Sequence, residues 1–141
     1  LPLANNYSQL GLGCVGELEN PITETEMLQY MKDKLNIQYI RHTQTSDKLV
    51  HRVALCGGSG AEFIPHAIRE KAGIYITADV KYHDFFNAEN QIVIADIGHF
   101  ESEQCIKEVF YEQLSKNFIN FAILMAECDK SPVKYTYLTE D

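Results

Sequence analysis

The fold is decided by three stretches of the chain: VALCGGSG at residues 53–60, IYITADVKYHD at 74–84 and IVIADIGH at 92–99. Each stretch begins with a short apolar run that is typical of a buried strand, and each run ends in glycine or polar residues. Patterns typical of helices lie between and after these runs. Strands that alternate with helices predict an α/β fold, here with three layers: a mostly parallel sheet with helices on both faces.

Further elements are expected on both sides of these stretches. Thr23, with Glu26 three residues later, fits a capping box, and a helix near 24–35 should follow it. Pro65 lies inside the next helical pattern, so that helix should be kinked or should begin close to Pro65. The remaining expected elements are a hairpin of strands 37–42 and 49–56, a helix reaching about residue 72, helices near 81–88 and over 101–117, a strand at 121–125 and an edge strand at 133–138.

Length and composition indicate one globular domain, because the chain has 141 residues of which 45% are hydrophobic. The expected organisation is an extended entry segment over 1–20 and a single α/β domain over 21–141. The sequence opens at Leu1 rather than at an initiator methionine. Processing of the N-terminus or a start inside a larger protein would each explain this opening.

The net charge and the cysteine spacing limit which partners the protein can bind and where in the cell it is expected. The formal net charge of −8, from 20 acidic and 12 basic residues, argues against binding to a nucleic-acid backbone. No apolar run approaches the roughly 20 residues that span a bilayer, so no membrane segment is expected. The four cysteines are widely spaced without a C-x-x-C pair, which indicates free thiols in a reducing compartment, and the expected location is the cytoplasm.

The strongest candidate for a functional site is the pair His99 and Glu103. His99 directly follows a predicted buried strand, and Glu103 lies four residues later in the first turn of a predicted helix. Residues four apart lie on the same face of a helix, so the imidazole and the carboxylate can converge on a metal ion. Such ligands suit zinc, manganese, iron or nickel. The alternative is that the acidic residues complement the helix dipole while His99 is an ordinary loop residue.

Two further groups lie at the ends of the other predicted strands. Asp79 and His83 are again four residues apart; the alternative is that Asp79 caps a helix and His83 faces solvent. The glycine-rich turn with Gly58 and Ser59 lacks the Lys-Ser/Thr of a P-loop. Its backbone N–H groups can hold a phosphate or carboxylate, or the turn can be only a tight connection between strand and helix.

These three groups, in this order, resemble the C-terminal part of the Nif-three-like family, whose members are also called GTP cyclohydrolase 1 type 2 homologues. The resemblance runs from about residue 11 to residue 138. Ala78 departs from it, because the family tends to carry glycine there. The matching segments are VALCGGSG at 53–60, YITADVKYHD at 75–84 and DIGH at 96–99 with Glu103.

The resemblance implies an α/β protein that binds two divalent metal ions and assembles into ring-shaped hexamers. It assigns His99 and Glu103 as metal ligands. The family's N-terminal half supplies a paired-histidine motif, and this sequence has no His-His pair. The resemblance therefore implies that this chain is the C-terminal part of a larger protein, that residues 1–20 lead back into the fold from a missing or inserted region, and that the metal site within this chain is incomplete.

The function expected on this basis is that of half of a dinuclear metal-dependent hydrolase with an unknown small-molecule substrate, the isolated chain being inactive. Asp79 and His83 are the candidate catalytic groups for proton transfer or substrate positioning, and Gly58 and Ser59 are candidates for holding an anionic substrate. The alternatives are a non-catalytic metal-binding scaffold or regulatory protein that recruits partners, and mononucleotide binding at the glycine turn.

Overall fold

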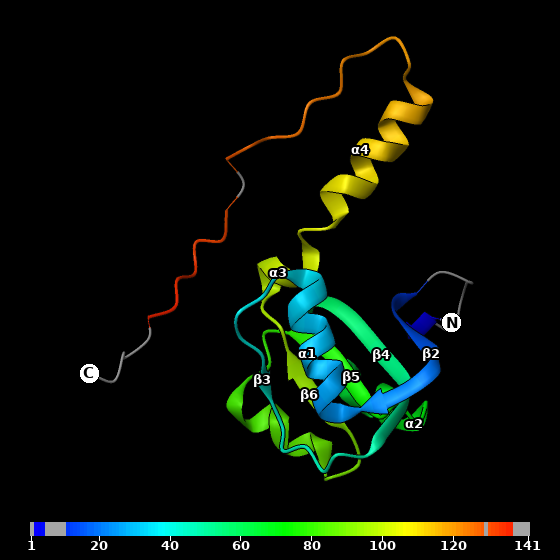
Figure 1. Ribbon diagram of the computed structural model, residues 1–141, viewed down its shortest axis with the longest axis vertical. Coiled ribbons are helices and arrows are strands. Elements are labelled where there is room, and N and C mark those ends of the chain that lie inside the picture. Colours follow the sequence, from blue (N-terminus) through cyan, green and yellow to red (C-terminus); the bar gives the residue numbers. More distant parts are fainter. Residues whose placement is uncertain (1, 5–10, 129, 137–141) are drawn as a thin grey trace. The chain divides into compact units, whose positions relative to one another are not determined.

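The computed structural model describes residues 2–4, 11–128 and 130–136 of the chain. The chain divides into two compact units between Glu103 and Gln104. The first unit contains the sheet and most of the helices (Figure 1). Its strands are β1 (Pro2–Ala4), β2 (Leu12–Thr23), β3 (Arg41–His42), β4 (Leu49–Ser59), β5 (Ile74–Ala78) and β6 (Val93–Asp96), and its helices are α1 (Glu24–Leu35), α2 (Ile64–Arg69), α3 (His99–Glu103) and the 3₁₀ helices η1 (Ala61–Phe63) and η2 (Tyr82–Ala88).

The six strands form one mixed sheet in the order β1-β2-β4-β5-β6-β3. Pairing is parallel between β4 and β5 and between β5 and β6, and antiparallel in the other three pairs. The prediction of an α/β fold is confirmed. The parallel part is the centre of the sheet, formed by the three strands on which the sequence prediction depends, and antiparallel strands extend it on both sides.

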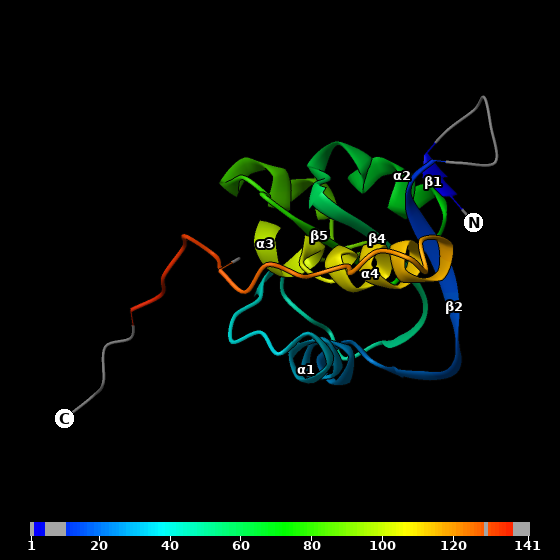
Figure 2. The same cartoon turned by 90° about the horizontal axis from the view of Figure 1, so that it is seen from above.

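Helices cover both faces of this sheet because the residues of its central strands alternate between two cores. Ala54, Tyr75 and Ile94 pack with α2 and η2 on one face. Their neighbours Val53 and Ile74 pack with α1 on the opposite face. Figure 2 shows α1 on one side of the sheet and α2 on the other. This two-sided burial explains why neighbouring positions of the central strands, such as Val53 and Ala54 or Ile74 and Tyr75, are both apolar.

The starts of the first two α-helices follow the sequence prediction, whereas α2 ends at Arg69 rather than near residue 72. The Thr23 side chain accepts a hydrogen bond from the backbone N–H of Glu26, and the Glu26 carboxylate accepts one from the N–H of Thr23, which completes the capping box of α1. Pro65 lies in the first turn of α2, where its missing N–H has no intrahelical partner to lose. The helix therefore begins beside Pro65 and needs no kink there.

The predicted hairpin of residues 37–42 and 49–56 is wrong. β3 pairs with β6, whereas β4 pairs with β2 and β5. Both edges of β4 are occupied in the sheet, so a strand immediately before it must pair elsewhere. The polar residues 43–48 connect β3 to β4, and at the start of this connection the Thr43 hydroxyl accepts a hydrogen bond from the N–H of Ile94.

The predicted helix over 101–117 is two helices: α3 begins at His99, and α4 (Ile106–Asn117) begins in the second unit. The predicted strand at 121–125 is also wrong, and residues 133–136 of the predicted edge strand have no regular structure; its residues 137 and 138 lie outside the described residues. An apolar run forms a strand only when another strand pairs with it. The described part of the second unit contains no other strand.

Most of β2 lies within residues 1–20, the segment expected to lead into the fold. The division into the domains 1–20 and 21–141 stays a prediction. Across residues 2–4, 11–128 and 130–136, no helix has both the length and the apolar character needed to cross a membrane.

Candidate functional site

The three parallel strands bring the predicted site residues to one edge of the sheet. β4, β5 and β6 run in the same direction, so their carboxyl ends lie together. At each end the chain turns through a residue with a left-handed backbone: Gly58 with φ 65°, Asp79 with φ 54° and Gly98 with φ 90°. These turns place the glycine-rich segment, Asp79 and the start of α3 next to one another.

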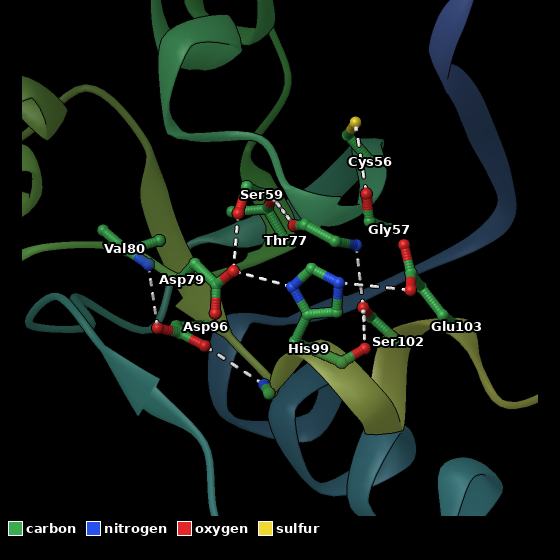
Figure 3. Close-up of polar contacts among 12 residues, drawn as sticks. Cys56, Gly57, Ser59, Thr77, Asp79, Val80, Asp96, His99, Ser102 and Glu103 are labelled. Atoms are coloured by element: carbon green, nitrogen blue, oxygen red, sulfur yellow. Dashed lines mark hydrogen bonds and ion pairs between the residues drawn. The ribbon is translucent and has the colours of Figure 1, made fainter.

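His99 and Glu103 are the first and last residues of α3, and their side chains meet. The distance from His99 Nε2 to Glu103 Oε2 is 3.2 Å. Their side chains are 50% and 52% exposed, so an ion or a small molecule can reach the pair from solvent. Figure 3 shows the imidazole ring with Glu103 on one side and Asp79 on the other.

Asp79 bonds the opposite nitrogen of the same ring. Its Oδ2 lies 2.6 Å from His99 Nδ1 and also accepts a 2.5 Å hydrogen bond from the Ser59 hydroxyl. The hydrogen bonds from Ser59 and then from His99 lower the pKa of Asp79 from its ordinary value. The hydrogen bond with Asp79 raises the pKa of His99, against a smaller opposing effect of burial. The ring is therefore held between two carboxylates.

The glycine-rich segment is tied to α3 rather than open to a ligand at every N–H. The N–H of Gly58 donates to the Ser102 hydroxyl at 2.9 Å, and that hydroxyl donates to the His99 carbonyl. The Gly58 carbonyl accepts from the Thr77 hydroxyl. A Cβ at Gly58 would lie 2.6 Å from Glu103 Oε1. The absence of a side chain at Gly58 therefore leaves room for the Glu103 carboxylate.

Sequence reasoning gave no role to Asp96, which links two of the loops around the site. This carboxylate is buried, with 6% of its surface exposed. One oxygen accepts the N–H of Val80 and pairs with Arg41, and the other accepts the N–H of Gly98. Asp96 thus fixes the loops after β5 and β6 relative to each other. An acidic residue at the end of an apolar run was the available signal, because a buried carboxylate needs such partners.

Of the six sequence-predicted site residues, five come together and His83 stands apart. Gly58, Ser59, Asp79, His99 and Glu103 are joined through the contacts described above. His83 is an exposed residue of η2 whose ring packs edge-on against Tyr82, with centroids 5.2 Å apart. Its predicted part in proton transfer or substrate positioning has no supporting contact among the described residues.

The donor atoms fit a divalent cation in kind but not in number. An imidazole nitrogen and a carboxylate oxygen are ligands that zinc, manganese, iron and nickel accept. Catalytic zinc usually takes three protein ligands. Among the described residues, no group of three or more histidine, cysteine or acidic side chains is placed to hold one metal ion. The pair of His99 and Glu103 can supply two ligands.

Comparison with known proteins finds relatives of the same kind over nearly the whole chain. A Staphylococcus epidermidis protein named GTP cyclohydrolase 1 type 2 homolog is 35% identical over 135 residues, which cover 93% of this chain and 37% of the relative. A Bacillus subtilis protein of the same name is 33% identical, with 97% of this chain and 37% of the relative covered. The chain therefore spans little more than a third of the length of these relatives.

Solved structures agree with this result. A Staphylococcus aureus protein of known crystal structure superimposes with a TM-score of 0.77 at 27% sequence identity, over 89% of this chain and 42% of that one. A Bacillus cereus protein related to NIF3 gives a TM-score of 0.75 at 26% identity, over 89% and 36% of the two chains. The Duf34/NIF3 (NGG1p interacting factor 3) family model matches residues 2–132, and the chain therefore belongs to the Duf34/NIF3 family.

Proposed function

We propose that His99 and Glu103 bind a divalent metal ion in a metal-dependent hydrolase. The observation that carries the proposal is the 3.2 Å approach of His99 Nε2 to Glu103 Oε2. When Nδ1 carries the ring proton and donates a hydrogen bond to Asp79, the lone pair of Nε2 faces the Glu103 carboxylate. Two acceptors this close need a proton or a cation between them. A metal ion satisfies both at once.

The remaining ligands in this proposal come from outside the described residues, in a protein that holds two metal ions. His99 and Glu103 lie on one helix turn, so the chain presents its two ligands already converged. When bound, a divalent metal ion polarises the substrate and makes a coordinated water more acidic. The half-exposed side chains leave the pair open toward solvent, where a small molecule can approach.

Hydrolysis is favoured because the relatives carry the name of a cyclohydrolase homologue. The substrate that we propose is an unidentified small molecule. Ser59 and Gly58 border the pair, but the N–H of Gly58 is already bonded to Ser102, so anion binding there would rely on other N–H groups of the segment. Asp79 is held against His99, which favours a part in orienting the site over direct proton transfer to substrate.

A non-catalytic role is the second candidate, and the family name favours it because it refers to an interacting factor. In that role the metal site would stabilise a homo-oligomeric ring that recruits partners. Under both candidates we propose a cytoplasmic protein, because all four cysteines are free thiols.

Zn²⁺ titration calorimetry tests the metal site, with elemental mass spectrometry of the dialysed protein as a second measurement. We expect His99→Ala and Glu103→Ala each to reduce Zn²⁺ binding at least about tenfold, because each removes one of two ligands. His51→Ala is the matched control, since His51 is an exposed histidine on β4. Equal Zn²⁺ binding by the wild type and His99→Ala would refute the site.

A second measurement separates the two candidate functions. The full-length Bacillus subtilis relative, which is longer than this chain, provides a comparison in which further ligands can be present. Hydrolysis of nucleotide substrates that disappears with a chelator and returns with Zn²⁺ or Mn²⁺ supports the hydrolase. Partner binding that is unaffected by the chelator, with no turnover, supports the scaffold.

A further inference from the structure

Asp79 is a half-exposed carboxylate that is nevertheless fixed by two side-chain hydrogen bonds. It directly follows β5, its backbone has φ 54°, and one of its oxygens, Oδ2, accepts hydrogen bonds from both Ser59 and His99. It does not cap the next helix, because the residue that precedes η2 is Lys81. The alternative role expected for Asp79 from sequence, a helix cap, is therefore not the one it has.

The two ring nitrogens of His99 face different carboxylates, and this decides what each carboxylate can do. Asp79 lies at Nδ1 and Glu103 lies at Nε2. Figure 3 shows Glu103 on the opposite side of the ring from the Asp79 oxygen that meets Nδ1, so a metal ion that Nε2 and Glu103 would hold would not take that oxygen as a ligand. Asp79 in this arrangement is not a ligand. It is the partner of the nitrogen that the metal does not use.

We propose that Asp79 is a positioning residue that holds His99 in the Nδ1–H tautomer, with Nε2 free to bind the metal ion beside Glu103. This proposal rests on the metal site proposed above. A neutral imidazole has one N–H, and the hydrogen bond made by one nitrogen determines which nitrogen is left to bind a metal. Asp79 and Glu103 compete for that single proton. The proton must go to Asp79 if Nε2 is to be a ligand.

Ser59 helps to hold the Asp79 carboxylate in place. Its hydroxyl donates to the same Oδ2 that accepts from His99, so it fixes the carboxylate from the side of β4 while Asp79 extends from β5. The ring itself is carried by α3, which follows β6. Three neighbouring parallel strands thus each supply one member of the chain Ser59, Asp79, His99. Ser59→Ala should weaken the orientation without removing it.

The test uses variants that keep the left-handed backbone at residue 79. Asp79→Gly removes the carboxylate at a φ that glycine adopts freely, and Asp79→Asn keeps an oxygen acceptor without the charge. Asp84→Asn is the control, because this acid lies in the same segment and its carboxylate accepts the N–H of Lys81. The first readout is the ¹⁵N chemical shifts of the His99 ring in metal-free protein, recorded as the pH is raised until the ring has lost its second proton, because Asp79 raises the pKa of His99. The second readout is Zn²⁺ affinity by calorimetry.

In the wild type we expect the Nδ1–H tautomer. In Asp79→Gly we expect a shift to the Nε2–H tautomer, because Glu103 is then the remaining acceptor, together with Zn²⁺ binding weaker by about 10- to 100-fold. Asp79→Asn should recover part of both effects, and Asp84→Asn should match the wild type. An Nε2–H tautomer in the wild type, or unchanged tautomer and affinity in Asp79→Gly, would overturn the proposal.

The two readouts fail independently. If neither the wild-type chain nor the full-length Bacillus subtilis relative binds Zn²⁺, the proposed metal site is overturned, whereas the ring shifts still decide whether Asp79 controls the tautomer of His99. A wild-type chain that binds Zn²⁺ while Asp79→Gly binds it equally well leaves the metal site intact and overturns the positioning role.

Discussion

The substitution Gly58→Ala tests whether the glycine-rich segment shapes the metal site through space rather than through its N–H groups. Gly58 has φ 65°, in the left-handed region that alanine adopts only at a cost. A Cβ built there lies 2.6 Å from Glu103 Oε1 and 3.4 Å from His99 Cε1. The first of these contacts is too close to persist, and the second is an ordinary contact.

The expected size of the effect follows from these two features. The left-handed backbone should cost alanine about 1–2 kcal/mol of unfolding free energy relative to glycine. The clash should add little to that cost, because the Glu103 side chain is half exposed and can swing into solvent. Its movement takes Oε2 away from the position 3.2 Å from His99 Nε2. Gly58→Ala should therefore lower Zn²⁺ affinity about as much as Glu103→Ala does.

Urea unfolding followed by circular dichroism measures the first effect, and Zn²⁺ titration calorimetry measures the second. Gly16→Ala is the matched control, because a Cβ at Gly16 meets nothing within 4 Å and its φ is not left-handed; its stability should change by less than about 0.5 kcal/mol. In the Glu103→Ala background, Gly58→Ala should keep its stability cost and lose its effect on Zn²⁺. Zn²⁺ affinity that stays at the wild-type value in Gly58→Ala would refute the reasoning.

Three further predictions concern the rest of the first unit. Hydrogen bonds from Thr23 lower the pKa of Glu26. The Glu26 carboxylate therefore stabilises the fold above the unfolded pKa near 4.5, and this contribution is lost as the pH falls through the lower folded pKa. The urea midpoints of wild type and Glu26→Gln should differ at pH 6 and converge in acid, and a constant difference would contradict the prediction. Tyr75→Phe should lower the free energy of unfolding by about 1 kcal/mol, because the buried Tyr75 hydroxyl donates a hydrogen bond to the Gly60 carbonyl at 2.8 Å. Urea unfolding measures this change, and an unchanged midpoint would contradict the prediction. Burial raises the pKa of Cys56, so under native conditions Cys56 should react with a thiol reagent more slowly than the other three cysteines. Peptide mapping of the labelled protein measures these rates, and labelling of Cys56 as fast as the exposed cysteines would contradict the prediction.

Sequence predicted the site as far as local spacing and strand direction determine it. His99 and Glu103 are four residues apart on one helix turn, so their meeting depends only on the period of the helix. The approach of Ser59 and Asp79 follows from two adjacent parallel strands whose carboxyl ends share an edge. Both inferences needed only apolar runs and the residues that end them.

Contacts that depend on register and on backbone handedness could not be predicted. The hydrogen bond between Asp79 and His99 needs β5 and β6 to pair with Thr77 beside Asp96, and it needs a left-handed turn at residue 79. No spacing rule places a histidine twenty residues away against that carboxylate. The wrong hairpin has a related cause: local polarity indicates a turn, but the choice of partner strand depends on which sheet edge is free.

Hydrogen bonds rather than packing hold the His99 ring, and this separates the stability of the fold from the affinity of the site. The side chains of Asp79, His99 and Glu103 are 48%, 50% and 52% exposed, so few apolar contacts restrain them. Exposed charged pairs contribute at most about 1 kcal/mol to folding. A ligand whose nitrogen must face the metal ion, however, depends fully on its tautomer. Asp79→Asn, which keeps a non-glycine residue at this left-handed position, should therefore leave the urea midpoint nearly unchanged while Zn²⁺ affinity falls, and a parallel loss of both would indicate that the carboxylate supports the fold itself.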